Sequence, residues 1–485
     1  MKKENIKLNY IFNTGYQIFA LLVPLITTPY ISRILQADGI GTYSFTYSIV
    51  SYFMLVAALG TGTFGIRQLG IDRNDDYKRS LTFWNTYLLR TITSIISISF
   101  YIMYCFLFSS NLIISLLQGL YLVGVMLDVS WFFQGMENFG KVALRNILIK
   151  IINILFIFVF VKSHDDLWIY ILGLTTLTIF GNLTMWFYLP KYIKKVKMSD
   201  IKPFSNIKDI LTLFFPTVAT QIYSIIDKSM IGLFCDGSVE NGYYEQAEKI
   251  VKMCLVLITS LGTVMIPKIS NSFKNNLEEE VKMYISKSYE FLWVLGIPMC
   301  IGLFFVSDRF VPVFFGEGFE KVGILLKILS LLFIFMGFNF ITGNQYLIST
   351  NQQNKYTLII SIGGITNVIM NFILIPSLNS CGAAIASVLG EIVSILVSFL
   401  ILRKDKYFRY KNIFNNIWKC VLAGIIMGIV LYLLDIYLQD SKISIGIMVI
   451  VASFIYFSVL IIFKETMIWN FIKKNIEKLK KINNE

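Results

Sequence analysis

The chain reads GTYSFTYSIVSYFMLVAALG at residues 41–60, and it repeats this pattern with one gap as GYYEQAEKIVKMCLVLITSLG at residues 242–262. A second pair lies at a similar separation: QGMENFGKVALRNILIKIIN ends at Asn153, and ISTNQQNKYTLIISIGGITN ends at Asn367. Two matches, each a little over two hundred residues apart, favour two homologous halves over chance similarity.

Long apolar runs surround these repeats and continue along the whole chain. The 485 residues are 56% apolar and 15% charged, with a mean hydropathy of +0.67, which is typical of an integral membrane protein. We count fourteen runs long enough to cross about 30 Å of hydrocarbon. The runs lack the period-two alternation of a membrane β-barrel. The sequence therefore predicts an all-α membrane protein of about fourteen transmembrane helices.

The repeats and the breaks between runs predict the domain organisation. We expect an N-lobe of six helices at residues 1–190, a basic linker at 191–206 and a C-lobe of six helices at 207–402. Two further helices and a basic tail occupy 403–485. Because six is even, both lobes enter the membrane from the same side, which predicts a parallel repeat with its pseudo-two-fold axis along the membrane normal.

Basic residues are distributed unevenly between the two ends of the spans. If the N-terminus is cytoplasmic, 32 Lys and Arg lie at inner ends and six at outer ends. The positive-inside rule then predicts a multi-pass membrane protein with both termini in the cytoplasm. This topology also explains the net charge of +13, so the basic residues do not indicate nucleic-acid binding.

The residues that support catalysis or metal binding are scarce. The six cysteines form no C-x-x-C pair, and His164 is the single histidine. It lies at an outer boundary beside two aspartates, where a solvated loop is the expected role. We therefore expect no enzyme activity, no metal site and no cofactor.

Polar residues inside the spans are the candidate binding residues, since charge at membrane depth costs about 3 kcal/mol on insertion scales and marks a wet cavity or a buried pair. The seventh span carries a polar stripe at three- and four-residue spacing, and other spans carry isolated polar groups. The candidates are Gln17, Arg90, Asp128, Gln221, Ser224, Asp227, Lys228, Glu245, Lys249, Lys252 and Glu391.

Structural explanations compete with binding at several of these positions. Glu245 and Lys249 are four residues apart, as are Glu248 and Lys252, so both pairs also fit ion pairs on the surface of one helix. An ion pair between Arg90 and Asp128 would likewise satisfy two charges without any ligand.

Several contiguous segments resemble the Wzx-type flippases of the multidrug/oligosaccharidyl-lipid/polysaccharide exporter superfamily. They are PLITTPYISRILQADGIGTYSFTYSIVSYFMLVAALG from Pro24, DVSWFFQGMENF from Asp128, and DKSMIGL followed by GYYEQAEKIVK and ITSLGTVMIPKIS. The resemblance covers the first twelve spans and weakens after about Arg403.

The resemblance implies a function and a set of partners. It implies two six-helix lobes around a central cavity, alternating access, and export of undecaprenyl-diphosphate-linked oligosaccharide units for capsule, exopolysaccharide or O-antigen assembly. The polyprenyl-diphosphate-linked oligosaccharide is then the substrate, and a polysaccharide polymerase and glycosyltransferases are expected partners. Arg90, Lys228 and Lys252 are candidate contacts for the diphosphate. Asp128, Asp227 and Glu391 are candidates for charge balance or for a coupling proton or Na⁺.

Two other readings stay open at this point. A related multidrug or peptidoglycan-precursor exporter would share the architecture, although drug exporters favour acidic cavities and this chain has both signs of charge in its spans. A multi-span polysaccharide polymerase or acyltransferase is the alternative of a different class, but the outer breaks are too short for the long catalytic loop of a polymerase.

Overall fold

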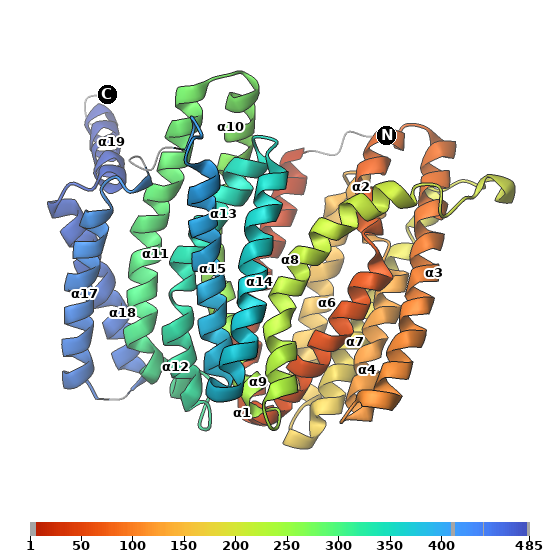
Figure 1. Cartoon of the computed structure of the whole chain (residues 1–485), viewed down its shortest axis with the longest axis horizontal. Coiled ribbons are helices and arrows are strands. Elements are labelled where there is room, and N and C mark those ends of the chain that lie inside the picture. The colour runs from red at the N-terminus through yellow and green to blue at the C-terminus, as the bar shows by residue number, and fades with distance from the viewer. Residues whose placement is uncertain (1–5, 409–412, 440, 483–485) are drawn as a thin grey trace. The chain divides into compact units, whose positions relative to one another are not determined.

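Helices make up all the regular secondary structure of the described chain in the computed structural model, and this confirms the predicted all-α fold (Figure 1). The structure describes residues 6–408, 413–439 and 441–482. Within these ranges it leaves out the side chains of residues 6–14, 18, 216, 219, 220, 222–224, 263, 471, 475, 476 and 478–482.

Contacts divide the helices into two units, which are described separately. The first unit holds residues 1–232 and 236–242, and the second holds 233–235 and 243–485. The helices mainly in the first unit are α1 (Ile6–Ala58), α2 (Thr61–Asp72), α3 (Asp76–Phe108), α4 (Leu112–Leu127), α5 (Ser130–Gly135), α6 (Phe139–Phe160), α7 (Leu167–Trp186) and α8 (Ile207–Phe234).

Those mainly in the second unit follow in chain order. They are α9 (Val239–Thr259), α10 (Gly262–Lys274), α11 (Glu278–Phe314), α12 (Glu320–Leu329), α13 (Leu332–Phe340), the π-helical turn η4 (Ile341–Ile348), α14 (Gln353–Leu378), α15 (Ser380–Leu402), α17 (Ile417–Tyr437), α18 (Lys442–Ile462) and α19 (Thr466–Ile482).

The lengths of these helices match membrane spans. Of the described residues, ten helices are long and apolar enough to cross a membrane, or twelve when each of two bent pairs counts as one span. The first of the ten runs from Gly15 to Asp72. At 1.5 Å per residue its 58 residues reach about 87 Å, far more than one crossing needs. Its backbone breaks at Gln36 (φ 55°), between the first two predicted spans.

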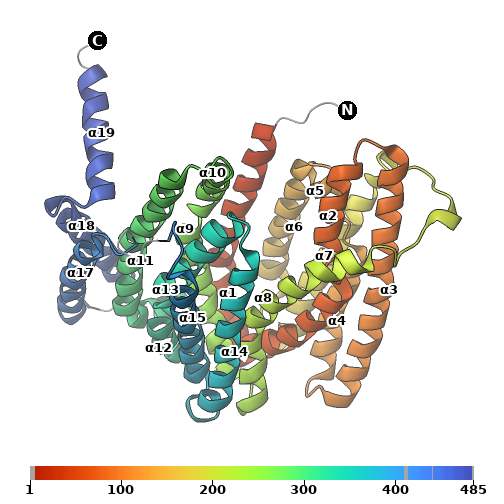
Figure 2. The same ribbon diagram turned by 45° about the horizontal axis from the view of Figure 1, so that its top comes forward.

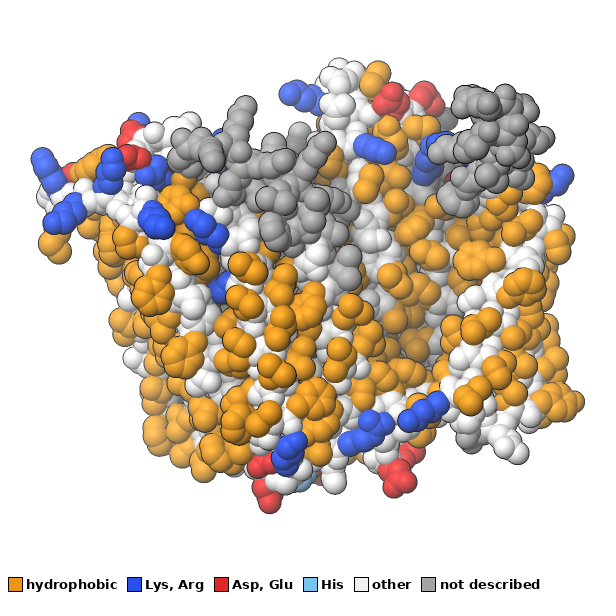
Figure 3. Space-filling model, turned by 180° about the vertical axis from the view of Figure 1, so that it is seen from behind, with side chains coloured by type: hydrophobic (Ala, Val, Ile, Leu, Met, Phe, Trp, Pro, Cys, Tyr) orange, Lys and Arg blue, Asp and Glu red, His pale blue; other side chains and the backbone are white. Residues whose placement is uncertain are grey.

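The surface of the helices has the pattern of a protein surrounded by lipid. Figure 3 shows hydrophobic side chains covering the sides of the helices, while Lys and Arg side chains gather near the helix ends. Large apolar residues such as Phe108, Phe454 and Ile462 are more than 70% exposed in the isolated chain. Because exposed apolar area of this kind is unfavourable in water, acyl chains are the environment these sides suit.

Two close glycine contacts in the first unit reflect the internal repeat of the sequence. Gly41 of α1 approaches the backbone of Ser238, and Gly242 of α9 approaches the backbone of Ala37. A methyl group on either glycine would overlap the carbonyl oxygen of the facing residue. The two contacts are equivalent under the repeat, because Gly41 and Gly242 are aligned and each carbonyl lies four residues before a glycine. Small residues permit this close crossing of helices in a membrane.

The segment after α7 is bound to the first unit. Arg79 of α3 donates through Nε to the carbonyl oxygen of Tyr192 at 2.9 Å, and the backbone amide of Lys202 donates to Asn85 Oδ1 at 2.7 Å. The Tyr77 hydroxyl donates to Asp200, and this hydrogen bond holds the pKa of the Asp200 carboxyl below its ordinary value. The contact grouping therefore places residues 191–206 and most of α8 with the first unit. The predicted division into lobes at 191–206 stays a prediction.

Candidate functional site

A break between α4 and α5 forms the centre of the polar site in the first unit. Helix α4 ends at Leu127, Asp128 adopts an extended conformation, and α5 begins at Ser130. The Asp128 Oδ1 accepts a hydrogen bond of 2.9 Å from the Ser130 backbone amide. A carboxylate in this place satisfies an amide at the start of α5 that has no partner inside the helix.

Two backbone carbonyl groups that the break leaves without a partner in the helix accept hydrogen bonds from side chains of α7. Asn182 of α7 donates to the oxygen of Gly124 at 2.8 Å, and Trp186 donates through Nε1 to the oxygen of Leu127 at 2.8 Å. Unpaired carbonyls inside a membrane cost several kcal/mol each, so these two side chains make a discontinuous span tolerable. Asn182 and Trp186, in the last two turns of α7, therefore have a structural role.

Arg90 of α3 completes the same arrangement. Its guanidinium donates to the Asp128 carbonyl oxygen at 3.2 Å and lies 3.4 Å from Asp128 Oδ2. The Arg90 side chain is 7% exposed and that of Asp128 is 28% exposed. This geometry is the structural pair that the sequence offered as an alternative to ligand binding at these two positions.

The polar face of α6 brings two more cations to this region. Arg145 donates through Nη1 to Asn182 Oδ1 at 2.7 Å and through Nη2 to Asn146 Oδ1 at 2.7 Å. Lys150 lies one and a half turns further along α6, with its Nζ 5.8 Å from the centre of the Tyr16 ring. Both side chains are half-buried. Within the described part of the chain neither makes an ion pair with a carboxylate, and Asp128 is the acidic group that acts on Arg145 electrostatically.

Lys150 is the more informative of the two cations. It is the twelfth residue of α6, about 16 Å from the start of a helix about 33 Å long. Charge at this depth is expensive unless water or a counter-charge reaches it. The half-buried ammonium therefore needs water, a counter-charge or an anionic ligand beside it. Asn146 and Asn153 share its side of the helix.

The other predicted candidates in the first unit are Gln17, Gln221, Ser224, Asp227 and Lys228. Gln17 and Gln221 are exposed, and the side chain of Ser224 lies outside the described residues. Asp227 is 7% exposed and Lys228 half-buried. The neighbouring Ser229 hydroxyl contacts Ser48 at 2.9 Å and Tyr52 at 3.0 Å, both on α1.

In the second unit the eighth predicted span carries the two expected ion pairs. Lys249 lies 3.8 Å from Glu245, and Lys252 lies 2.6 Å from Glu248, each four residues apart on α9. Both lysines are partly exposed and both glutamates largely buried. The pairs lower the cost of these charges whether or not they also contact a ligand.

Glu391 of α15 is held by a neighbouring amide. The Asn339 Nδ2 donates to Glu391 Oε2 at 2.5 Å and to the Glu391 carbonyl oxygen at 3.1 Å. Glu391 is 7% exposed, and Tyr356 of α14 interacts with it electrostatically. This buried carboxyl is therefore embedded in a polar network of α13, α14 and α15 in the second unit.

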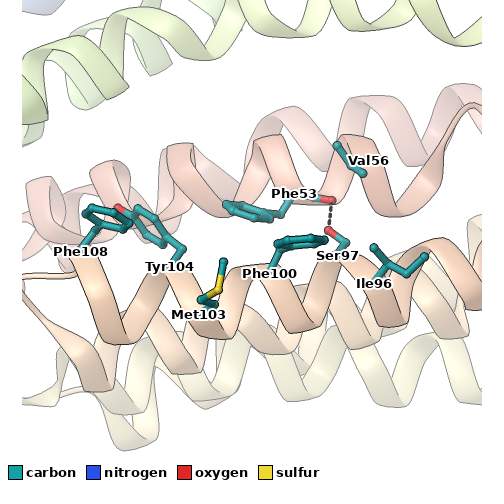
Figure 4. Close-up of a pocket in the computed structure, with 8 residues that line it drawn as sticks. All are labelled: Phe53, Val56, Ile96, Ser97, Phe100, Met103, Tyr104 and Phe108. Carbon is teal, nitrogen blue, oxygen red and sulfur yellow. Dashed lines mark hydrogen bonds between the residues drawn. The ribbon is translucent and has the colours of Figure 1, made fainter.

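Two cavities lie apart from these residues. One of about 410 Å³ lies between α1 and α3 and is lined by seven apolar or aromatic residues and Ser97, whose hydroxyl is bound to the Phe53 carbonyl (Figure 4). It lacks any charged group and suits an acyl chain. A second cavity, of about 600 Å³, lies in the second unit, and its lining includes Lys355, Lys404 and Lys406.

In the part of the chain that the structure describes, no group of three or more His, Cys, Asp or Glu could hold a metal ion.

Comparison with known proteins identifies the family. Residues 6–273, more than half of the chain, match the family described as polysaccharide biosynthesis protein. The chain belongs to this family. The family match confirms the resemblance drawn from the sequence. A putative O-antigen transporter of Escherichia coli is 23% identical over 410 residues, which cover 83% of this chain and 98% of that protein.

Solved transporters share the fold of this family member. The lipid II flippase MurJ in an inward closed conformation has a TM-score of 0.74 and 18% identity, and the match covers 95% of this chain and 99% of MurJ. An inward-facing multidrug transporter of the MATE family has a TM-score of 0.60 and 15% identity, over 80% of this chain and 98% of its own. These similarities confirm the predicted fold class, and the relatives are named as transporters or flippases rather than enzymes.

Proposed function

We propose that the chain is a flippase that moves undecaprenyl-diphosphate-linked oligosaccharide repeat units from the inner to the outer leaflet of a bacterial plasma membrane. Family membership supports a role in polysaccharide biosynthesis, and the names of its relatives support transport of a lipid-linked precursor. The product would enter capsule, exopolysaccharide or O-antigen assembly. Glycosyltransferases would act before the flippase, and a polysaccharide polymerase would act after it.

The observation that carries the proposal is the pair of cations on α6. Arg145 and Lys150 place a guanidinium and an ammonium within the span formed by α6, and among the described residues neither makes an ion pair with a carboxylate. A diphosphate carries concentrated negative charge and many acceptor oxygens, and guanidinium and ammonium groups bind such anions well. We assign Arg145 and Lys150 to the diphosphate, in addition to the predicted contacts Lys228 and Lys252.

The cycle we propose is alternating access by rocking of the two halves of the repeat. Both termini would lie in the cytoplasm, as the distribution of basic residues predicts. Asp227 and Glu391 are buried carboxyl groups on α8 and α15, which makes them the candidates for binding a coupling proton or Na⁺. In this scheme Arg90 stabilises the break between α4 and α5 and does not bind the substrate.

A related multidrug exporter is the nearest competing function. Cationic drugs favour an acidic, aromatic cavity, whereas the two newly found residues in the first unit are basic. The sign of the charge therefore favours an anionic substrate.

A deletion strain tests the function. Without the gene, we expect lipid-linked repeat units to accumulate in the inner leaflet and polymer to disappear from the cell surface. The intact gene should restore both. Outward movement that continues at the normal rate in the deletion strain, with no related exporter present, would contradict the proposal.

A further inference from the structure

The C-terminal helix α19 has a charge pattern that the proposed function leaves unexplained. Its sequence, TMIWNFIKKNIEKLKKI, places apolar residues at 468, 472, 476 and 479, which fall on one side of a helix at three- and four-residue spacing. Its five lysines occupy the other side and the flanks, against a single acidic residue, Glu477. A 17-residue helix with this charge is too polar to span a membrane and has the composition of one that lies on its surface.

A structured corner sets where α19 begins. Helix α18 ends at Ile462, and Lys464 has a positive φ of 48° that turns the chain. The buried Glu465 accepts a hydrogen bond of 2.9 Å from the amide of Ile468 and so caps the new helix. The corner is therefore a defined element of the second unit.

Contacts from the start of α17 tie the corner down. Asn416 donates to the Thr466 hydroxyl at 2.8 Å, and Lys419 Nζ donates to the Lys464 carbonyl at 3.1 Å. These bonds place the first turn of α19 at the same level as the end of α18 and the beginning of α17. That level is one edge of two apolar spans, so α19 starts at the boundary between acyl chains and headgroups.

Aromatic and basic side chains gather at this boundary. Trp418 stacks edge-on against Phe463, with ring centres 5.8 Å apart, and Trp469 lies under the ammonium of Lys464 at 5.4 Å. Both tryptophans are exposed. Tryptophan and lysine at this depth are typical of the membrane interface.

Most of α19 extends away from α17 and α18 (Figure 2). Met467 and Trp469 are exposed in its first turn, and so are Lys473, Lys474 and Glu477 further along. On the apolar side of the helix, Ile468 and Ile472 are half-buried. An apolar side beside a membrane edge, with exposed lysines on the opposite side, suits a partner that offers apolar groups to one side of the helix and negative charge to the other. A bilayer surface with anionic headgroups has that chemistry.

We propose that α19 lies on the membrane surface and binds anionic lipid headgroups. Its apolar side enters the interface, and its lysines contact the phosphates of anionic lipids. The corner at residues 463–466 transmits this attachment to α17 and α18. The proposal does not depend on which substrate the protein carries.

Backbone amide exchange of the full chain in lipid nanodiscs tests this. In nanodiscs that contain phosphatidylglycerol, we expect the amides of residues 466–482 to exchange at least tenfold more slowly than in nanodiscs of phosphatidylcholine alone. Raised salt should remove most of the difference, because it screens charge at the surface. The variant Ile472→Asp should lose the protection, while Glu477→Gln, on the polar side, should keep it.

Two outcomes would overturn the proposal. Equal protection in both lipids would mean that headgroup charge plays no part. Rapid exchange in both, with Ile472→Asp behaving like the parent chain, would mean that α19 does not lie on the membrane.

Discussion

Replacing Lys150 by Gln lowers export of the lipid-linked substrate by about 10- to 100-fold while the protein folds normally. A charge-assisted hydrogen bond to an anion is worth about 1.5–3 kcal/mol, and each 1.4 kcal/mol corresponds to a factor of ten. The fold should tolerate the change, because Lys150 makes no ion pair in the described chain and its charge is costly at mid-membrane depth. We therefore expect export to fall while the thermal midpoint of the protein stays the same or rises.

The measurement is surface polymer together with protein level and thermal midpoint in detergent. Lys150→Arg keeps the charge and should retain most of the export. Lys162→Gln is a matched control, because Lys162 is exposed after the end of α6, where its Nζ contacts the Phe158 carbonyl and lies 6.0 Å from the centre of the Tyr30 ring. Normal export by Lys150→Gln would remove this residue from the substrate site.

Replacing Arg90 by Ala has the second large effect, and it acts on stability. The change removes the donor to the Asp128 carbonyl and leaves the Asp128 carboxylate without its cation beside the break in the fourth span. Removing one partner of a buried pair costs about 3 kcal/mol or more. We expect a lower thermal midpoint and less protein in the membrane, with export falling in proportion to the protein lost.

Asp128→Asn is the informative companion to this variant. An amide oxygen can still accept the Ser130 backbone hydrogen bond, and Arg90 can still donate to the backbone carbonyl of residue 128, so its loss of stability should be smaller than that of Arg90→Ala. If Arg90→Ala instead keeps the native midpoint and protein level but exports nothing, Arg90 binds substrate and the structural assignment is wrong.

The sequence predicted the spans well because membrane burial leaves a strong signal. Each of the fourteen predicted runs coincides with one or more of the described helices, and the two ion pairs on α9 followed from four-residue spacing alone. Hydropathy does not reveal where a span is broken. The sequence predicted that Asp128 is a buried charge within a continuous helix, whereas the structure shows that it links α4 to α5.

Arg145 and Lys150 were missed as site residues for a related reason. Both were counted among the basic residues at the inner end of the fifth span, where they agree with the positive-inside rule. The predicted fifth span, residues 142–161, already placed Lys150 near its middle, and α6 places it there too. The polar face with Asn146 and Asn153 at three- and four-residue spacing was the available signal.

The most direct test of a wet, cationic surface on α6 is the reactivity of single cysteines at positions 150 and 155, in a chain whose six native cysteines are replaced. Leu155 is 60% exposed in the isolated chain, whereas Lys150 is half-buried. Only a thiolate reacts with a membrane-impermeant maleimide, and a thiol among acyl chains does not ionise. We predict that Lys150→Cys reacts and is protected by the lipid-linked substrate, while Leu155→Cys stays unreactive. An unreactive cysteine at 150, or equal reaction at 155, would contradict the account.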